Sequence, residues 1–194
     1  MARPETGGRP PQIAVAWRMI RTARLVLQPW SERLREGFAA LHADPEVMAD
    51  QGGPISPAAS DAKFDRYRAA FERDGVSRWA VEGGRGQFVG YVGVMFRPEM
   101  DHPLGSHYEI GWRLARSAWG LGYATEAARS ALDHAVSVLG DQEIVSYTSE
   151  TNQRSRAVMD RLGLKREPTR DFTIEDGRMG SWRGLVWTAS AGQV

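Results

Sequence analysis

The stretch that decides the fold runs from Glu109 to Ala127 and reads Glu-Ile-Gly-Trp-Arg-Leu-Ala-Arg-Ser-Ala-Trp-Gly-Leu-Gly-Tyr-Ala-Thr-Glu-Ala. Its first part predicts a strand that ends near Leu114, and its last part predicts the start of a helix. Apolar residues continue along that helix at the spacing of one buried face, at Ala124, Ala128, Ala131, Leu132, Ala135, Val136 and Leu139. Gly120 and Gly122 lie between strand and helix, where the backbone can approach a ligand closely. Because the first N–H groups of a helix lack partners within the helix, the turn predicts a phosphate site.

This glycine pair is a weak signal by itself, since many strand-to-helix turns are only structural. A dinucleotide-binding fingerprint fits poorly, because it needs a third small residue at the position of Thr125 within a repeated strand–helix array. The turn lies instead in the middle of the chain, after a predicted hairpin. The GxxxxGK[ST] phosphate loop does not occur in the sequence.

The composition limits the classes of function. The chain has 194 residues, which suits one domain, and it has no cysteine, which excludes disulfides, thiolate metal sites and a cysteine nucleophile. Its 25 basic and 24 acidic residues give no electrostatic reason to bind nucleic acid or an anionic membrane. No apolar run approaches the roughly 20 residues of a membrane span, and the start lacks a signal-peptide core. We therefore expect a cytoplasmic protein. The four histidines are scattered without ligand spacing, so we expect no metal site.

The rest of the chain predicts one folded domain behind a leader. Residues 1–21 are rich in glycine and proline and predict a disordered leader, in which Met19 is a second candidate for the translation start. Residues 22–190 predict the domain. Strands are expected at 24–28, 78–82, 87–97, 143–148, 164–174 and 181–187, and further helices at 31–42, 57–73 and 152–162. This order predicts an α/β (α+β mixed) sheet with at least one parallel crossover.

Two separated motifs resemble the GNAT (N-acetyltransferase) superfamily, and most closely its RimJ/RimL-type branch. The first is the block Trp-Gly-Leu-Gly-Tyr-Ala-Thr-Glu-Ala from Trp119 to Ala127, preceded by the strand from Glu109. The second is Asn152-Gln-Arg-Ser155, followed by Val158 and Leu162-Gly-Leu164. The resemblance runs from about Thr22 to Trp187. It implies the GNAT fold, a central twisted mixed sheet of about seven strands that splays between strands 4 and 5 and is flanked by about four helices.

The resemblance also implies acetyl-CoA as cosubstrate, with pantetheine in the gap between the fourth and fifth strands. Its amides would pair with the end of the fourth strand at Trp112, Arg113 and Leu114. The pyrophosphate would lie on the turn formed by Trp119, Gly120, Leu121, Gly122, Tyr123, Ala124 and Thr125. Asn152 and Ser155 would approach from the other side of the gap.

For catalysis the resemblance implies direct transfer from the thioester to a primary amine. Some members of the family place a base Glu on the fifth strand and an acid Tyr in the fourth helix, but the matching positions here hold Tyr147 and Met159. Glu109, acting through water, is the best remaining base; a structural strand carboxylate is the alternative. Ser155 is the best donor to the thiolate, unless it serves only the helix cap. Tyr147 would donate to the tetrahedral intermediate, unless it is a packed core residue.

The acceptor expected from this branch is a protein N-terminal α-amine, and the alternative is a small-amine or aminoglycoside acetyltransferase. Because the Glu/Tyr pair is missing, a non-catalytic acyl-CoA-binding sensor is a rival from another class, and a nicotinamide enzyme is a third. Many members of the family are dimers, so a homodimer is left open. We expect neither a nucleic-acid nor a membrane partner.

Overall fold

The computed structural model describes residues 19–189. Most of the predicted leader lies outside the described residues, but Ile20 and Arg21 at its end form a strand that pairs with residues 26–27. Ordered structure therefore begins before residue 22. None of the helices between residues 19 and 189 is long and apolar enough to cross a membrane.

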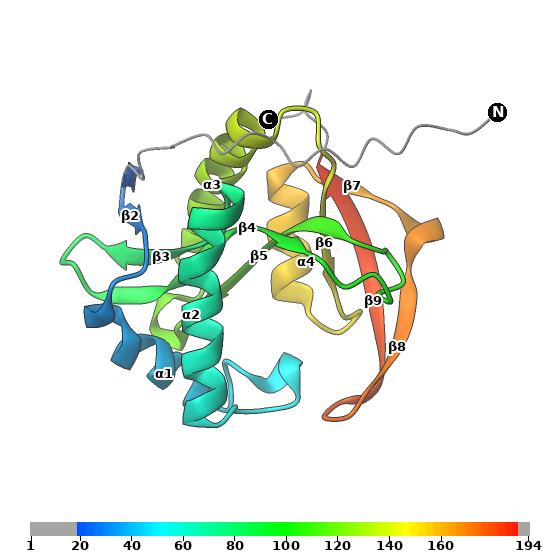
Figure 1. Cartoon of the computed structure of the whole chain (residues 1–194), viewed down its shortest axis with the longest axis horizontal. Coiled ribbons are helices and arrows are strands. Elements are labelled where there is room, and N and C mark those ends of the chain that lie inside the picture. Colours follow the sequence, from blue (N-terminus) through cyan, green and yellow to red (C-terminus); the bar gives the residue numbers. More distant parts are fainter. Residues whose placement is uncertain (1–18, 190–194) are drawn as a thin grey trace.

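A single mixed sheet forms the centre of the molecule (Figure 1). Its order is β1-β2-β3-β4-β5-β6-β9-β7, and β8 pairs with β9 outside this path. The strands are β1 (Ile20–Arg21), β2 (Leu25–Gln28), β3 (Arg78–Gly83), β4 (Phe88–Arg97), β5 (His107–Leu114), β6 (Ile144–Thr148), β7 (Lys165–Arg166), β8 (Phe172–Asp176) and β9 (Gly180–Ala189). Two of these strands, β1 and β7, have only two residues each. The predicted central mixed sheet is confirmed, with nine strands in the described residues where about seven were expected.

The splay that was predicted between the family's fourth and fifth strands lies between β5 and β6, because β5 contains the segment matched to the fourth strand. These two strands are parallel and pair only where Tyr108 faces Ile144 and Glu109 faces Val145. Just past this point the Ser146 hydroxyl donates to the Ile110 carbonyl at 3.0 Å. Beyond that bond β5 continues to Leu114 on its pairing with β4, and β6 continues to Thr148 on its pairing with β9. The two strands separate because each follows its outer neighbour, which opens the centre of the sheet.

Four α-helices cover the sheet: α1 (Arg35–Ala43), α2 (Pro57–Asp74), α3 (Tyr123–Leu139) and α4 (Gln153–Leu162). α1 and α2 lie on one face, and α3 and α4 lie on the other (Figure 1). On the α1–α2 face an aromatic cluster forms around Trp30, with Phe38 and Phe64 edge-on to it at centroid distances of 4.9 and 5.2 Å. Tyr67 of α2 packs edge-on against Tyr91 of β4 at 5.3 Å. Such pairs add about 0.5–1.5 kcal/mol each to simple burial, and they hold α2 over the sheet.

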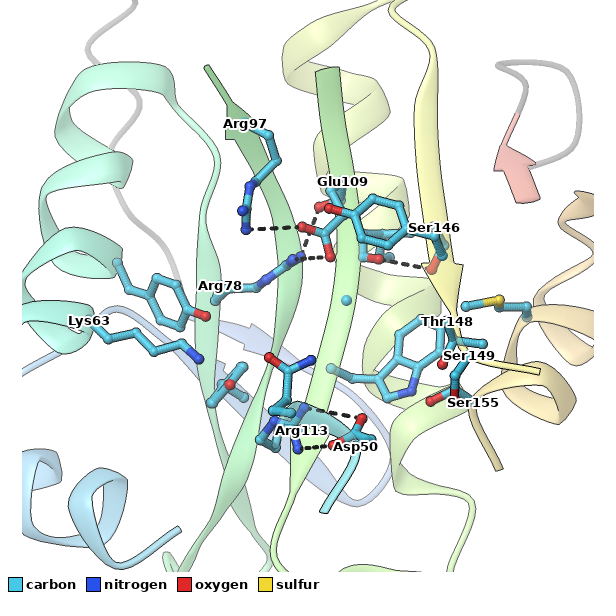
Figure 2. A pocket seen from close by; sticks show the side chains of 18 of the residues that line it. Asp50, Lys63, Arg78, Arg97, Glu109, Arg113, Ser146, Thr148, Ser149 and Ser155 are labelled. Carbon is cyan, nitrogen blue, oxygen red and sulfur yellow. Dashed lines mark hydrogen bonds and ion pairs between the residues drawn. The ribbon is translucent and has the colours of Figure 1, made fainter. Parts of the chain in front are cut away.

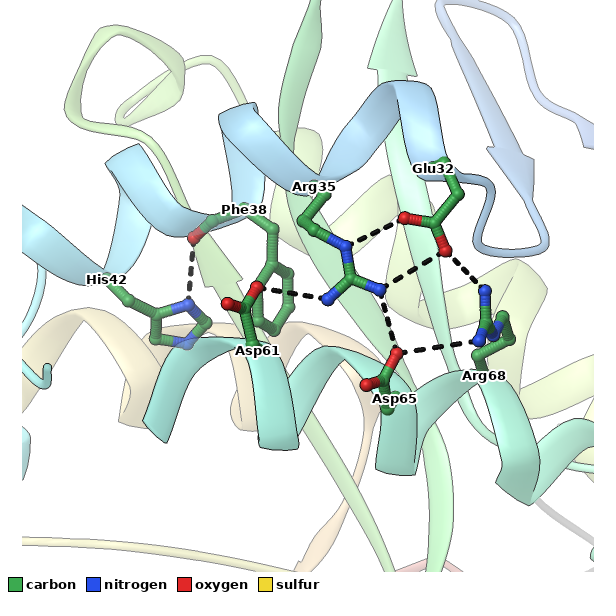
Figure 3. A network of polar contacts seen from close by, with 7 residues as sticks. All are labelled: Glu32, Arg35, Phe38, His42, Asp61, Asp65 and Arg68. Carbon is green, nitrogen blue, oxygen red and sulfur yellow. Dashed lines mark hydrogen bonds and ion pairs between the residues drawn. The ribbon is translucent and has the colours of Figure 1, made fainter. Parts of the chain in front are cut away.

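A surface network of ion pairs links α1 to α2 and orients the two helices relative to each other (Figure 3). Arg35 of α1 bonds Glu32 at 2.8 Å, Asp61 at 3.0 Å and Asp65 at 2.9 Å, and the last two lie on α2. Arg68 of α2 forms an ion pair with Glu32. Exposed ion pairs contribute only about 0–1 kcal/mol each, so the network sets the orientation of α2 more than the stability of the fold.

One sequence prediction is wrong in detail. Residues 164–174 do not form one strand, because β7 ends at Arg166 and a 3-10 turn over Pro168–Arg170 separates it from β8. Proline lacks an N–H group and cannot continue a sheet ladder. The resulting bend lets both segments pair with β9.

Candidate functional site

Two hollows meet at the gap between β5 and β6. The first, here called the α3 groove, has a volume of about 1180 Å³ and is lined by the end of β5, the Gly120–Gly122 turn and the starts of α3 and α4. The second, the α2 pocket, has a volume of about 290 Å³ and lies between α2 and strands β3 to β6. Five residues line both hollows and form the neck between them: Asp50, Trp112, Arg113, Ser149 and Ser155. The site is therefore open from both faces of the sheet.

Most residues predicted to bind the cofactor line the α3 groove. These are Trp112, Arg113, Leu114, Trp119, Gly120, Gly122, Tyr123, Ala124, Thr125, Asn152 and Ser155. Leu121 is the exception, since its side chain is exposed and its carbonyl accepts a hydrogen bond from Arg24 at 2.8 Å. One groove thus joins segments that the sequence separates by about 30 residues.

The turn into α3 has the features of an anion site. Gly120 and Gly122 have φ of +75° and +77°, a left-handed conformation that favours glycine. Gly122 is the N-cap of α3, and no side chain caps the first turn. A Cβ at Gly120 would meet no described atom within 4 Å, so the space above the turn is open. A pyrophosphate fits here, because uncapped N–H groups and the helix dipole both favour negative charge.

Three arginines add positive charge to the same groove: Arg129, Arg154 and Arg161. The guanidinium group of Arg154 lies 3.8 Å from the centre of the Trp119 ring, and the Trp119 indole donates to the Leu114 carbonyl at 2.9 Å. These contacts connect α4, the turn and the end of β5. The groove therefore presents several cationic groups to phosphate oxygens.

Glu126 in the first turn of α3 anchors the turn to the N-terminal part of the chain. Its carboxylate accepts hydrogen bonds from the Arg24 backbone at 2.9 Å and the Arg24 side chain at 2.7 Å, and also from the Thr22 hydroxyl. Burial opposes the charge, but these hydrogen bonds outweigh it and lower the pKa of Glu126. The carboxylate is therefore committed to structure and leaves the N–H groups of the turn free for a ligand.

The end of β5 offers a free backbone edge to the gap. Because the Ile110 carbonyl points toward β6, the alternation of a strand directs the backbone groups of Trp112 and Leu114 to the same side. Arg113 faces the other way and pairs with Tyr91 of β4. The Leu114 carbonyl is taken by Trp119, whereas the edge at Trp112 faces the neck. An extended amide chain such as pantetheine can pair there as an added strand.

The opposite wall is the start of α4. Asn152 is its N-cap, as predicted, and its side-chain oxygen accepts from the Ser155 N–H at 3.1 Å. The amide nitrogen of Asn152 donates to Asp50 at 3.3 Å. The Asp50 carboxylate also forms an ion pair with Arg113 at 2.7 Å. The Arg113 guanidinium donates a further hydrogen bond to the Val47 carbonyl. Asp50 therefore links the two walls at the neck, a role that the sequence analysis missed.

The α2 pocket is strongly cationic (Figure 2). Its lining contains five basic side chains, which are Lys63, Arg66, Arg78, Arg97 and Arg113, and two carboxylates, Asp50 and Glu109. The basic side chains come from α2, β3, β4 and β5, which are far apart in the sequence. The pocket thus holds more positive than negative charge before any ligand enters.

Glu109 lies at the β5 wall of this pocket between two arginines. Its carboxylate is 3.0 Å from Arg78 and 3.5 Å from Arg97, and Arg78 also donates to the Glu109 carbonyl at 2.8 Å. Gly111 leaves room for this arrangement, because a Cβ there would lie 2.9 Å from the Arg78 guanidinium. The alternative of a structural strand carboxylate is thus present in the form of two ion pairs, whereas the role of Glu109 as a base stays a prediction.

Tyr147 also lines the α2 pocket, and it packs within an aromatic group. Its ring lies 5.5 Å from His102, 5.4 Å from Phe172 and 6.3 Å from Trp182. Burial, with the nearby Glu109 charge adding to it, raises the pKa of Tyr147. The phenol is therefore protonated at neutral pH and can act as a hydrogen-bond donor. Of the three residues predicted to be catalytic, Glu109 and Tyr147 line the pocket, and Ser155 lies at the neck.

The open mixed sheet with its four described helices is the fold of the GNAT class of proteins. Residues 24–165 match the sequence model of the "Acetyltransferase (GNAT) domain" family. The chain therefore belongs to the GNAT acetyltransferase family, whose members use acetyl-CoA.

Curated relatives agree with this assignment. The chain is 34% identical over 151 residues to FsC-acetyl coenzyme A-N(2)-transacetylase of Aspergillus fumigatus. The matched region covers 75% of this chain and 64% of the fungal protein. It is 30% identical over 129 residues to the uncharacterized protein YkkB of Bacillus subtilis, over 66% of this chain and 73% of that protein. The chain thus spans just under two thirds of the fungal relative.

Solved structures share the fold. An acetyltransferase from Agrobacterium tumefaciens superposes with a TM-score of 0.74 at 27% identity, over 94% of this chain and 99% of that one. Mycobacterium smegmatis RimJ in complex with CoA-disulfide gives 0.64 at 21% identity, over 88% and 83%. Spermidine N-acetyltransferase from Vibrio cholerae, in complex with CoA and spermine, gives 0.68 at 16% identity, over 87% and 96%. At these last two identities the likeness concerns the fold alone.

Proposed function

We propose that this protein transfers the acetyl group of acetyl-CoA to a primary amine, with acetyl-CoA in the α3 groove and the amine in the α2 pocket. The observation that carries the proposal is the neck, where the two hollows share five residues between the diverging strands. A cosubstrate on one face and an acceptor on the other can meet there. Acetyl-CoA, when bound, supplies the activated thioester.

The α3 groove has a binding group for each part of this cosubstrate. The uncapped turn at Gly120–Gly122 suits the pyrophosphate, and the backbone edge at Trp112 suits the pantetheine amides. Arg129, Arg154 and Arg161 suit the remaining phosphate charge. Holding both reactants at the neck supplies much of the rate enhancement, because it converts a bimolecular step into a unimolecular one.

The acceptor amine has to reach the thioester in its neutral form. The surplus of positive charge in the α2 pocket favours this form, because nearby like charges lower the pKa of a bound ammonium group. A strong general base is then not required. We assign Glu109 two roles, which are to hold Arg78 and Arg97 in place and to accept the amine proton through water on its side toward Arg97, where the ion pair is longest.

Two hydroxyl groups are placed to assist the reaction. Tyr147 is a protonated phenol in the α2 pocket and is assigned as donor to the tetrahedral oxygen. Ser155 lies at the neck, and we assign its hydroxyl as donor to the departing thiolate. Its backbone N–H already serves the Asn152 cap, so the helix-cap alternative and the catalytic role are compatible.

The predicted RimJ/RimL-type branch and its protein N-terminal acceptor belong to this proposal. The branch is proposed on the Trp119–Ala127 and Asn152–Leu164 motifs, and Mycobacterium smegmatis RimJ shares the fold. The small-amine alternative is supported by the size of the α2 pocket, since about 290 Å³ lies at the lower end of small-molecule sites. Both alternatives use the same neck and the same chemistry.

A thiol-release assay tests the function. Acetyl-CoA is supplied with a panel of amino acids, polyamines, aminoglycosides and short N-terminal peptides, and free CoA is measured against a blank without acceptor. Release above the blank with at least one amine is expected. Tight CoA binding without release from any acceptor would favour the rival class, a non-catalytic acyl-CoA sensor. Binding of NAD(H) in place of CoA would overturn both.

A further inference from the structure

The positive charge of the α2 pocket is only partly compensated. Arg113 pairs with Asp50 at 2.7 Å, Arg78 pairs with Glu109 at 3.0 Å, and Arg97 lies 3.2 Å from Glu99 as well as near Glu109. Lys63 and Arg66 differ from these three. Within residues 19–189 neither has a carboxylate at ion-pair distance, although both line the pocket. Lys63 and the more exposed Arg66 therefore line the pocket without a carboxylate at ion-pair distance within the described residues, although Arg66 is close enough to Glu99 to help lower its pKa.

These two cations lie together on one face of α2. Residues 63, 66 and 67 are spaced i, i+3 and i+4, so their side chains are neighbours on the helix surface. The Lys63 ammonium lies 6.0 Å from the ring centres of both Tyr67 and Tyr91, and the Arg66 guanidinium lies 5.9 Å from the Tyr67 ring centre. Figure 2 shows Lys63 pointing toward the space in front of β5. The aromatic rings give the two cations a common platform.

Lys63 keeps its charge in this place. It is partly buried, and burial opposes the charge, but the neighbouring oxygens of Tyr67 and Tyr91 outweigh that effect and raise the pKa of Lys63. Lys63 is therefore protonated at neutral pH, and it has no carboxylate partner at ion-pair distance within residues 19–189. A ligand with a negative charge can form an ion pair with it in a partly buried place, where such a pair is screened less than on the open surface.

We propose that the acceptor of this transferase is a primary amine that also carries an anionic group, such as a carboxylate, and that Lys63 and Arg66 bind that group. The inference rests on the proposed acetyl transfer at the neck and adds the class of acceptor. The anion binds at α2 and the amine points toward Trp112 and Ser155 at the neck. Polyamines and aminoglycosides, which carry several positive charges, are disfavoured by the same field.

The size of the pocket restricts the acceptor further. A volume of about 290 Å³ suits a molecule of amino-acid size, or the first residue of a peptide chain. The anionic group then comes either from a free carboxylate or from an acidic side chain at a peptide N-terminus. Both sources present the same chemistry to Lys63 and Arg66.

Matched acceptor pairs that differ in one charge test the proposal. For small acceptors the pair is β-alanine and β-alaninamide; for peptides it is Asp-Ala-Ala-amide and Asn-Ala-Ala-amide. The expected result is a kcat/KM at least tenfold higher for the charged member of at least one pair, with spermidine below both members. The pair that shows the preference identifies the source of the anion. Equal or reversed kcat/KM values within both pairs would overturn the proposal.

Variants of α2 locate the effect. Lys63→Met and Arg66→Met remove one charge each while keeping a long side chain, and each is expected to reduce the preference for the charged acceptor at least tenfold. Arg68→Met is the matched control, because it removes the same charge from the same helix at a residue that bonds Glu32 on the surface. Acetyl-CoA affinity should be unchanged in all three. An undiminished preference in Lys63→Met and Arg66→Met would also overturn the assignment.

A binding measurement separates this proposal from the proposed function. Titration calorimetry in the presence of CoA compares N-acetyl-β-alanine with its amide, and N-acetyl-Asp-Ala-Ala-amide with its Asn counterpart. Tighter binding of a charged product, lost in Lys63→Met, supports the anion subsite even if no amine releases thiol from acetyl-CoA. Failure of thiol release contradicts the transferase function, whereas equal binding of charged and neutral products contradicts the subsite.

Discussion

His42 should make the stability of this protein depend on pH between 6.5 and 4. The side chain is fully buried, and its Nδ1 donates to the Phe38 carbonyl at 2.9 Å (Figure 3). Its Nε2 lies 3.3 Å from the Tyr91 hydroxyl. Burial, with the charge of Lys63 adding to it, lowers the pKa of His42 from 6.5 to about 4. A proton on this ring would place a charge in the aromatic cluster that supports the α2 pocket.

The magnitude follows from the two pKa values. The unfolded chain binds the proton below pH 6.5, whereas the native protein binds it only near pH 4, so stability is lost as the pH falls through this range. At pH 5 the loss attributable to His42 is about 2 kcal/mol relative to pH 7.5. The full loss below pH 4 approaches about 3 kcal/mol.

Urea unfolding at pH 7.5 and pH 5 measures this loss. His42→Asn and His42→Leu are the comparison proteins, because neither side chain titrates. Both are expected to be less stable than the wild type at pH 7.5, but to lose about 2 kcal/mol less between the two pH values. Other groups titrate equally in all three proteins and cancel. The same pH-dependent loss in all three proteins would refute the reasoning.

Three further changes probe the site. Gly122→Val places a side chain in the groove at a residue with φ of +77° and should weaken CoA binding at least tenfold in calorimetry. Gly84→Ala in the β3–β4 hairpin is the control and should leave CoA binding unchanged. Equal CoA affinities of Gly122→Val and the wild type would remove the turn from the cofactor site. Glu109→Gln should lower kcat/KM mainly where the acceptor is protonated, and an unaltered pH–rate profile would exclude Glu109 as proton acceptor. Asp50→Asn removes the charge that Arg113 faces at the neck and should cost about 1–2 kcal/mol of stability and raise the KM for acetyl-CoA severalfold. A KM and an unfolding midpoint both equal to wild type would show that Asp50 does not organise the neck.

The sequence predicted the turn and the helix cap that line the α3 groove because their signals are local. The turn needs glycines at two positions two residues apart, and the cap needs Asn152 three residues before Ser155, so both patterns can be read within a few residues. The helix and strand periods around them predicted the order of elements for the same reason. Within the predicted turn, Leu121 is the residue that does not line the groove.

The acceptor side could not be predicted in the same way. Lys63 and Arg66 look like ordinary solvent-facing residues of an amphipathic helix until the sheet places β5 opposite them. Asp50 lies in a short 3-10 turn with no pattern of its own. Its role arises from contacts with Arg113 and Asn152, which follow it in the sequence by 63 and 102 positions. Such groups become a site only through long-range packing, which single-sequence periodicity does not encode.

The central claim is that acetyl-CoA and the acceptor meet at the neck between β5 and β6. A crystal structure of the protein with CoA and a charged N-acetyl product tests it most directly. The pyrophosphate is expected on the Gly120–Gly122 turn, the thiol at the neck beside Ser155, and the anionic group of the product at Lys63 and Arg66. Density for CoA outside the α3 groove, or for the product outside the α2 pocket, would contradict the account.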